Sequence, residues 1–266
     1  GMDMDELVEQ YSPDQVVAAW DEQWRPTWRV QLLPEYKAHR VKPGTENDED
    51  IPPELAPQIP LVAQALALLG IQVIGQPDQE ADDVLGLLTA HWSGETLVVT
   101  GDRDLFQLVD DSKRISVVYT GAGMKKLQVI DDVWLHNKYG LGPGQYLDFA
   151  ALRGDASDGL PGVPGIGDKT AAKLLTEFND VAGIIAAAES GNAALSARIQ
   201  ANVLAARDYL TAVKSVIAVG QQTSLPPIAE QGAPDAEEFH AFAERWGLGR
   251  PAERALKAVL SISEGS

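Results

Sequence analysis

The sequence of 266 residues contains no cysteine, and aromatic residues make up only 6% of it. The lack of cysteine excludes a disulfide framework and a zinc site built on thiolates, and it fits a reducing compartment. No apolar run is long enough to span a bilayer, and no signal peptide opens the chain. Because hydrophobic residues still account for 45% of the sequence, we expect a folded cytoplasmic protein with no membrane partner.

Positive charge is also scarce. The chain has 21 Lys and Arg residues against 39 Asp and Glu residues, and its formal net charge is −18. This balance excludes a protein that coats nucleic acid by bulk electrostatic attraction. Two explanations of the acidity remain open: it keeps the protein soluble, and part of it forms a site that binds cations. Any contact with nucleic acid then depends on local basic residues, backbone amides and bound metal ions.

The first half of the chain alternates between predicted strands and helices. Apolar runs predict strands at residues 15–20, 71–74, 96–100 and 115–120, and amphipathic segments predict helices at residues 57–69 and 80–91. The polar segment 41–53 predicts a mobile loop. This alternation predicts an α/β fold with a doubly wound sheet, which binds ligands at the carboxyl ends of its strands. Asp21 and Asp102 each follow a predicted strand, so we expect both at such a site.

The second half of the chain predicts helices only. They cover residues 132–139, 143–152, 170–178 and a long Ala-rich stretch at 194–219. An acidic, Pro-containing segment at 223–237 predicts a linker, and residues 239–246 predict a last helix. We therefore expect an all-helical second module after the α/β core.

Acidic residues gather in three clusters, each of which ends an apolar element. Each cluster has a structural explanation of its own: acids in a first helical turn complement the helix dipole, and Asp is common in turns and caps. Their joint placement favours a common site instead. The clusters are Glu80, Asp82 and Asp83; Asp102 and Asp104; and Asp155 and Asp158.

Such a set of carboxylates suits hard divalent cations. Mg²⁺ and Mn²⁺ prefer oxygen ligands, whereas zinc sites use Cys or His, and the four His residues stand in no metal-binding motif. Two ions roughly 3.5–4 Å apart activate water and stabilise the leaving oxygen in phosphodiester cleavage. The clusters therefore predict a site for two or more Mg²⁺ or Mn²⁺ ions.

A Gly-rich segment at residues 160–172 precedes a predicted helix. Glycines let the backbone approach a phosphate closely, and a helix N-terminus presents N–H groups to it. An ordinary turn between helices is the alternative. Because Lys169 and Thr170 follow Gly165 and Gly167, a helix-hairpin-helix grip on a DNA phosphate is the better interpretation.

A small basic and aromatic group stands out in this acidic chain. We expect these residues to draw a DNA strand towards the metal ions, with Tyr36 or His39 stacking on a base. A solvated helix end is the structural alternative. The group comprises Arg29, Tyr36, Lys37, His39 and Arg40.

The order of these motifs resembles that of a known family. A strand ending in Asp21 is followed by WR, PEYKAHR, EADD, TGDRDL, GDASDGLPG and VPGIGDKTAAKLL. This series is similar to the 5′-nuclease (flap endonuclease) superfamily, and most of all to the 5′→3′ exonuclease domain of bacterial DNA polymerase I as a stand-alone protein. The resemblance covers residues 15–178 and is looser beyond them.

The resemblance implies a PIN-like core, a helical arch and a helix-three-turn-helix DNA-binding domain. We expect the core at residues 1–140, the DNA-binding domain at 141–222, and a linker with a C-terminal helix that packs back on the core at 223–266. It also implies that Lys37 and Arg40 are catalytic and contact the scissile strand. The carbonyls of Gly162, Val163 and Ile166 match a turn that holds K⁺ against a DNA phosphate. The implied metal-binding acids are Asp21, Glu80, Asp82, Asp83, Asp102, Asp104, Asp155 and Asp158.

The beginning of the sequence departs from the family pattern. The family starts with a strand that carries a further metal-binding Asp, whereas Gly1 stands at the helix that follows this strand. Either the sequence is a piece that lacks this start, or the protein has lost it. In the second case one metal site lacks a ligand and the sheet lacks a central strand.

These observations predict a 5′-nuclease that cleaves flaps and nicked or gapped ends of DNA in replication and repair. We expect a monomer in the cytoplasm, at the nucleoid, with a DNA polymerase or ligase as a possible protein partner. The alternative is a DNA-junction-binding protein of the same fold with weak or no catalysis. A third hypothesis is a PIN-type ribonuclease, against which the Gly-rich hairpin argues.

Overall fold

The α/β part of the computed structural model contains two separate groups of strands. The structure describes residues 4–123, 126–221, 224 and 227–265. Strands β1 (Val17–Trp20) and β2 (Gln72–Gly75) pair in parallel, with Val17 opposite Gln72. Strands β3 (Thr96–Thr100) and β4 (Ile115–Tyr119) also pair in parallel, and β5 (Gln128–Ile130) runs antiparallel to β4. The four predicted strands are therefore confirmed within two residues at each end, and β5 is an addition.

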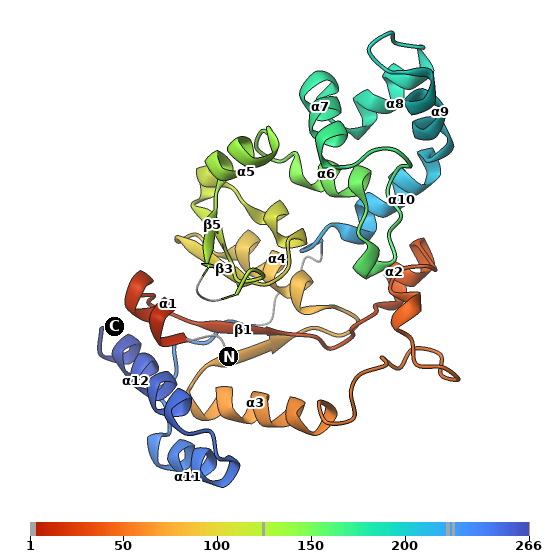
Figure 1. The fold of residues 1–266 in the computed structure, drawn as a ribbon. Helices are drawn as coiled ribbons and strands as arrows, with labels where there is room; N and C mark the ends of the chain where they lie inside the picture. Colours follow the sequence, from red (N-terminus) through yellow and green to blue (C-terminus); the bar gives the residue numbers. More distant parts are fainter. Residues whose placement is uncertain (1–3, 124–125, 222–223, 225–226, 266) are drawn as a thin grey trace.

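The single predicted sheet is present as two sheets. One contains β1 and β2 and the other contains β3, β4 and β5, and no strand of the described residues joins β1 to β3. Figure 1 shows both sheets with α4 (Ala81–His91) close to them. The site predicted at the strand ends therefore lies between two sheets that the helices and loops hold together.

The helix α4 is the central helix of this part. Val84 and Leu87 on it are fully buried, and its first turn forms a capping box in which Glu80 and Asp83 bond to each other's backbone N–H groups. The predicted helix at 57–69 is α3 (Ile59–Leu68), and the predicted helix at 132–139 is α5 (Asp132–Tyr139). Two further helices precede α3: α1 (Met4–Tyr11) and α2 (Thr27–Leu32).

The segment between α2 and α3 is where the resemblance implies a helical arch. It contains two 3-10 turns, Ala38–Arg40 and Ala56–Gln58, and no α-helix. The loop between these turns folds back through a bridge between Val41 and Glu49. This acidic loop carries three prolines and a glycine, which disfavour a helix.

The second part is all helical, as predicted, and it has more helices than expected. It comprises α6 (Tyr146–Arg153), α7 (Asp168–Phe178), α8 (Val181–Glu189), α9 (Ala197–Ala205) and α10 (Arg207–Ile217). The single helix predicted at 194–219 was wrong, because the chain turns at Ala206 between α9 and α10. No glycine or proline marks that turn, so the Ala-rich sequence concealed it.

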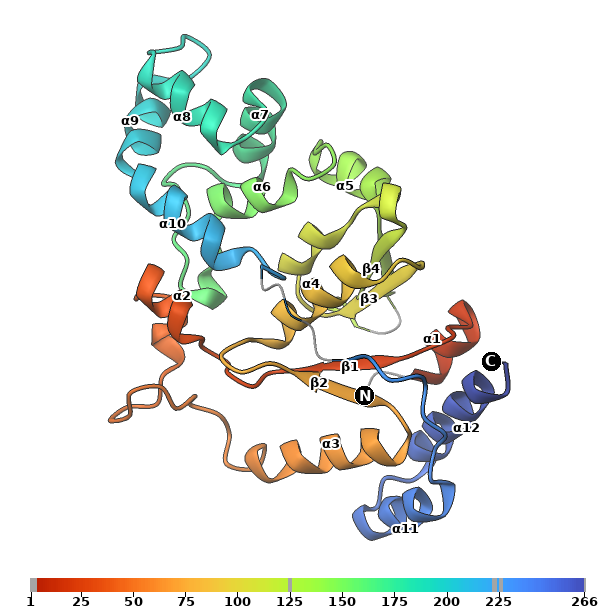
Figure 2. The same ribbon diagram turned by 180° about the vertical axis from the view of Figure 1, so that it is seen from behind.

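The C-terminal segment packs against the first part of the chain. Helices α11 (Ala236–Trp246) and α12 (Arg250–Gly265) lie beside α3 and α1 (Figures 1 and 2). Phe239, Leu256 and Val259 form a core cluster with Leu69 and Ile71. The sequence predicted one helix here and missed α12. The predicted linker at 223–237 falls partly outside the described residues, and no described helix has the length and apolar character needed to cross a membrane.

Candidate metal site and nucleic-acid interface

The acidic clusters meet where β1 and β3 end. Asp21 directly follows β1, and its Oδ1 accepts a hydrogen bond of 2.6 Å from the backbone N–H of Ala81 at the start of α4. Asp102 follows β3, and its Oδ1 accepts a bond of 2.8 Å from the backbone N–H of Asp104. Asp155 caps a 3-10 turn that carries Asp158. Asp21 and Asp102 therefore lie at the carboxyl ends of strands, and the segment after α6 brings Asp155 and Asp158 to the same region.

The carboxylates are close enough to disturb each other's ionisation. Burial, followed by the charges of Asp102 and Glu80, raises the pKa of Asp82 to about 8. Burial, followed by the charges of Asp102, Asp155 and Asp158, raises the pKa of Asp104 to about 7. Three distant chain segments thus contribute to one region of negative charge, in which the carboxylates repel one another.

The side chains are not arranged as a finished metal centre. In the described part of the chain, no three His, Cys, Asp or Glu side chains are placed to ligate a single ion. A cavity of about 20 Å³ separates some of them, and it is lined by Glu80, Asp82, Asp102, Asp104 and Asp158 together with Arg29, Tyr36 and the end of α10. The donors are carboxylate oxygens, which suit hard divalent cations.

Asp83, predicted as a metal ligand, and Arg29, predicted as a DNA contact, are paired with each other in the structure. Arg29 is 2% exposed, and its guanidinium donates to both carboxylate oxygens of Asp83 at 2.6 and 2.7 Å. Asp83 also accepts from the backbone N–H of Glu80 at 3.1 Å. Three hydrogen bonds thus occupy the Asp83 carboxylate, and two of them form a bidentate pair with one buried guanidinium. Asp83 is therefore a structural partner of Arg29, and Arg29 is too buried to contact DNA.

Tyr36 is likewise unable to stack on a base. It is 4% exposed, and its hydroxyl donates to Glu80 Oε2 at 2.7 Å. Glu80 also accepts from Arg29 at 2.8 Å and pairs with the Lys37 ammonium group through Oε1. Burial raises the pKa of Glu80, and the charges of Lys37 and Arg29 oppose that rise. Lys37 therefore occupies the oxygen of Glu80 that Arg29 and Tyr36 do not bind.

Lys37 and Arg40 lie beside the acidic residues. Lys37 adopts a left-handed backbone conformation with φ of 50°, and its N–H donates to the carbonyl of Asp158 at 2.9 Å. Arg40 lies 3.7 Å from an Asp158 carboxylate oxygen and pairs with Glu49 at 2.7 Å. His39 is exposed on the same turn. The positive charges of Lys37 and Arg40 therefore lie close to the acidic residues.

Arg153 is a residue of the site that the sequence analysis missed. Its guanidinium is 11% exposed, lies 3.8 Å from Asp104 and stacks on Phe149 with 5.4 Å to the ring centroid. It opposes the rise in the pKa of Asp104 that burial and the other acids cause. Its place in the sequence could have pointed to this role, because Arg153 directly precedes the segment that carries Asp155 and Asp158.

The Gly-rich hairpin has the conformation that its sequence predicts. Gly162 and Gly165 have φ angles of 64° and 81°, and a Cβ atom on Gly162 would lie 2.3 Å from the carbonyl oxygen of Arg153. Gly167 directly precedes α7, and nothing lies within 4 Å of where its Cβ would be. Lys169 is exposed and Thr170 half-buried in the first turn of that helix. The hairpin therefore leaves its backbone accessible beside a lysine.

The three carbonyls matched to a potassium site belong to this hairpin. The side chains of Val163 and Ile166 are buried, and the backbone N–H of Ile166 donates to the carbonyl of Val163 at 3.0 Å. Gly162 donates its N–H to the hydroxyl of Tyr209 at 3.0 Å, which ties the turn to α10.

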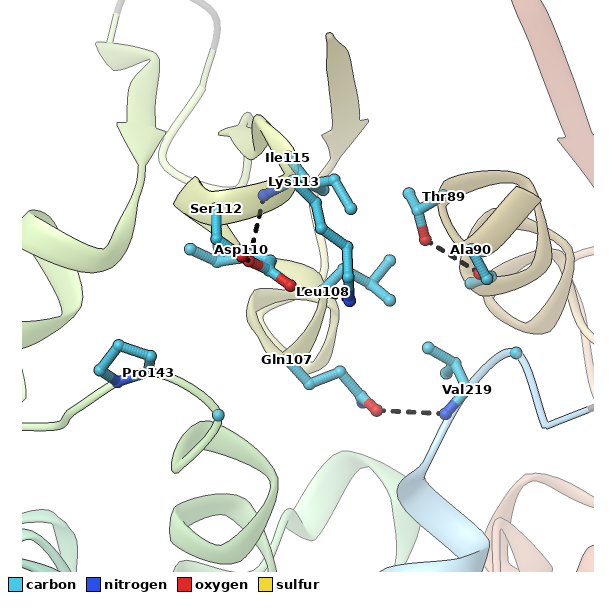
Figure 3. Close-up of a pocket in the computed structure, with 14 residues that line it drawn as sticks. Thr89, Ala90, Gln107, Leu108, Asp110, Ser112, Lys113, Ile115, Pro143 and Val219 are labelled. Carbon is cyan, nitrogen blue, oxygen red and sulfur yellow. Dashed lines mark hydrogen bonds and ion pairs between the residues drawn. The ribbon is translucent and has the colours of Figure 1, made fainter. Parts of the chain in front are cut away.

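A cavity larger than the one at the acidic site lies elsewhere in the structure. It has a volume of about 610 Å³ and lies against the second half of α4, the segment 107–115 and Gly220 (Figure 3). None of the acids or cations predicted from the sequence lines it. Charge and chemistry, and not the size of a cavity, therefore identify the functional site.

Together these features define a class of enzyme. The α/β core gathers carboxylates, and Lys37 and Arg40 lie beside them. A hairpin in the helical part exposes its backbone. This combination is typical of nucleases that use divalent metal ions.

Comparisons with known proteins identify the family. Residues 2–140 match the family model described as 5′-3′ exonuclease, N-terminal resolvase-like domain, and residues 141–236 match the 5′-3′ exonuclease, C-terminal SAM fold. A 5′-3′ exonuclease of Streptomyces coelicolor is 45% identical over 262 residues, which are 96% of this chain and 87% of that protein. The chain belongs to the 5′-3′ exonuclease family, and it is a nuclease.

Solved structures show the same fold. The T5 5′-exonuclease with bound zinc ions superposes with a TM-score of 0.63 at 17% identity, over 97% of this chain and 88% of that one. A complex of the T5 flap endonuclease with DNA and metal ions has a TM-score of 0.59 at 19% identity, with the same coverage of 97% and 88%.

Proposed function

We propose that this nuclease hydrolyses DNA at 5′ flaps and at nicked or gapped ends with the help of Mg²⁺ or Mn²⁺. The observation that carries the proposal is the convergence of Asp82, Asp104 and Asp158 from three chain segments beside Lys37 and Arg40. The T5 flap endonuclease, a neighbour in fold, was solved with DNA and metal ions.

Seven acids remain as candidate ligands once Asp83 is assigned to Arg29. In our proposal Glu80, Asp102 and Asp104 hold one ion, and Asp155 and Asp158 hold another. Asp21 and Asp82 would contact the ions partly through metal-bound water. The ions supply an activated water and stabilise the leaving oxygen. The raised pKa values of Asp82 and Asp104 support this assignment, because a cation stabilises the ionised form that burial disfavours.

Lys37 and Arg40 are proposed to bind the scissile phosphate. Lys37 is paired with Glu80 in this structure, and Glu80 needs that oxygen to reach an ion. We infer that Lys37 turns from Glu80 to the phosphate when metal and DNA bind. Its charge then offsets the negative charge that develops during hydrolysis. His39, which is exposed on the same turn, is left as a contact with the DNA strand.

The helical hairpin is proposed to hold the duplex beyond the cleavage point. The backbone at Gly165 and Gly167, with Lys169 and Thr170, would bind one phosphate. A K⁺ ion on the carbonyls of Gly162, Val163 and Ile166 would add a cation to an acidic chain. We accordingly propose three parts of the chain: the core at residues 1–140, the DNA-binding domain at 141–222, and the C-terminal segment at 223–266.

The cellular setting is part of the same proposal. We infer that the enzyme acts as a monomer in the cytoplasm, at the nucleoid, where flaps and gaps arise during replication and repair. Removal of a flap leaves a nick, which is the substrate of a DNA ligase, and a gap is the substrate of a DNA polymerase. These two enzymes are therefore the partners that the product chemistry suggests.

A panel of labelled substrates tests the proposed activity. We expect cleavage of a 5′-flap DNA with Mg²⁺ or Mn²⁺, no cleavage with EDTA, and much slower cleavage of an RNA flap of the same sequence. Faster cleavage of the RNA flap would support a ribonuclease instead. Tight binding of the flap without cleavage in Mg²⁺, Mn²⁺ or Co²⁺ would support a junction-binding protein.

Replacing Lys169 by alanine tests the hairpin separately from the metal site. We expect weaker binding of flap DNA in Ca²⁺, and a slope of log affinity against log salt that is smaller by about one, because one phosphate contact is lost. Fluorescence anisotropy at several salt concentrations measures both quantities. Lys257→Ala, an exposed lysine on α12, is the matched control, and equal effects in the two variants would contradict the assignment.

A further inference from the structure

The C-terminal end of α10 is hydrogen-bonded to two side chains, Arg29 and Gln107, that also contact the acidic segments 80–83 and 102–104. The last carbonyls of a helix have no partner within the helix, so side chains or solvent must satisfy them. Here the carbonyl of Val216 accepts from Arg29 Nε at 2.7 Å, and the carbonyl of Ile217 accepts from Gln107 Nε2 at 2.9 Å. Both side chains also contact the segments that carry the acids.

Gln107 connects three backbone groups. Its Nε2 also donates to the carbonyl of Asp104 at 2.9 Å. Its Oε1 accepts from the N–H of Val219 at 3.1 Å, a contact that Figure 3 shows. One amide thus ties the turn that presents Asp104 to two residues at the end of α10. Both N–H donors of the amide and one lone pair of its oxygen are used within the protein, which fits a structural role for Gln107.

Arg29 provides the same connection for the other cluster. Its remaining nitrogens bind Glu80 at 2.8 Å and Asp83 at 2.6 and 2.7 Å, while its Nε holds Val216. The two acidic segments, 80–83 and 102–104, are therefore fixed to one short stretch at the end of α10. Near its start, α10 binds the hairpin through Tyr209 and Gly162.

We propose that Gln107 is a positioning residue for the metal site, which fixes the turn of Asp104 by fastening it to the end of α10. The inference rests on the metal site proposed above. A carboxylate ligand binds an ion well only when its backbone is held in place, and groups outside the ligand shell supply that restraint. The helical part is then a component of the metal site as well as a DNA-binding surface.

A matched pair of glutamines separates this role from a general effect on stability. Gln145 also makes three bonds to backbone groups, with the N–H of Gly142 and the carbonyls of Leu175 and Asn179, and it lies among α6 and α7, away from the acids. Methionine resembles glutamine in length and shape but makes none of these bonds. Gln107→Met and Gln145→Met therefore remove the same number of bonds at two places.

The readout is the dissociation constant for Mn²⁺ of the full chain without DNA, measured by electron paramagnetic resonance of the unbound ion. We expect Gln107→Met to weaken Mn²⁺ binding by about tenfold, which is the usual cost of losing a partner outside the ligand shell. We expect Gln145→Met to bind Mn²⁺ as the unchanged protein does, although both variants unfold at lower temperature. Flap cleavage at saturating DNA falls with Gln107→Met, and DNA affinity in Ca²⁺ does not.

Two outcomes would overturn the inference: Mn²⁺ affinity that is unchanged in Gln107→Met, and equal weakening in both variants. If Gln107→Met does not fold, Gln107→Asn decides, because its amide is one methylene too short to keep all three bonds. Unchanged Mn²⁺ affinity in that variant would also overturn it. Failure of the unchanged protein to bind Mn²⁺ would instead contradict the proposed metal site itself.

Discussion

Replacing Asp104 and Asp158 together by asparagine is expected to lower flap cleavage by about 10³-fold or more, because the ions they hold contribute several kcal/mol to the transition state. Asparagine keeps the shape of each side chain and removes the charge that binds the cation. Single-turnover cleavage at saturating Mg²⁺ measures the loss.

Loss of folding is not an alternative explanation for that result. Burial and neighbouring acids already raise the pKa of Asp104 to about 7, so removing its charge relieves repulsion when no metal is present. We expect the metal-free double variant to melt at or above the temperature of the unchanged protein. Asp208→Asn with Glu237→Gln removes two exposed charges on α10 and α11 and is the control, which should cleave normally. Full activity in the double variant would rule out the metal mechanism.

Replacing Lys37 by methionine has the second largest expected effect. We expect cleavage at saturating DNA to fall by about 10²–10³-fold, the usual cost of removing one group that stabilises transition-state charge. The methylene stem of methionine preserves the packing of the lysine stem beside Tyr36, and the charge beside Glu80 is lost. Rapid-quench kinetics on a labelled flap, with DNA affinity measured in Ca²⁺, separates the rate from binding.

Lys42→Met is the control for this variant, since Lys42 is exposed on the adjacent loop. We expect it to cleave at the normal rate. Lys37→Arg should recover part of the activity because it restores the charge with a different shape. A Lys37→Met enzyme with an undiminished rate would show that Lys37 serves only as a partner of Glu80.

Local patterns were sufficient to predict much of the fold. The apolar runs at β1, β2, β3 and β4 and the helical spacing of α4 are properties of neighbouring residues, and the structure confirms all of them. The turn at Ala206 was missed because no glycine or proline marks it. The break before α12 does carry Gly247, Gly249 and Pro251, so the sequence contained a signal for this helix that was overlooked. The arrangement of the strands as two sheets depends on pairing between distant segments, which no local pattern contains.

The roles of Glu80 and Asp83 show where sequence reasoning ends. A spacing of three in a first helical turn fits two ligands on one face, and it fits a capping box equally well. What decides between these roles is Arg29, which is 54 positions from Asp83 and folds against it. The buried guanidinium binds both carboxylate oxygens of Asp83 but only one oxygen of Glu80, which is why we propose a structural role for Asp83 and keep Glu80 as a candidate ligand.

The sequence by itself determined the family, the class of chemistry and the set of acids that a metal-dependent nuclease needs, because residue type and order carry that information. Only the tertiary structure decided which acid is structural, that Lys37 covers Glu80, and that Arg153 and Gln107 support Asp104. These contacts join segments far apart in the chain, and their geometry depends on how β1, β3, α4 and α10 pack together.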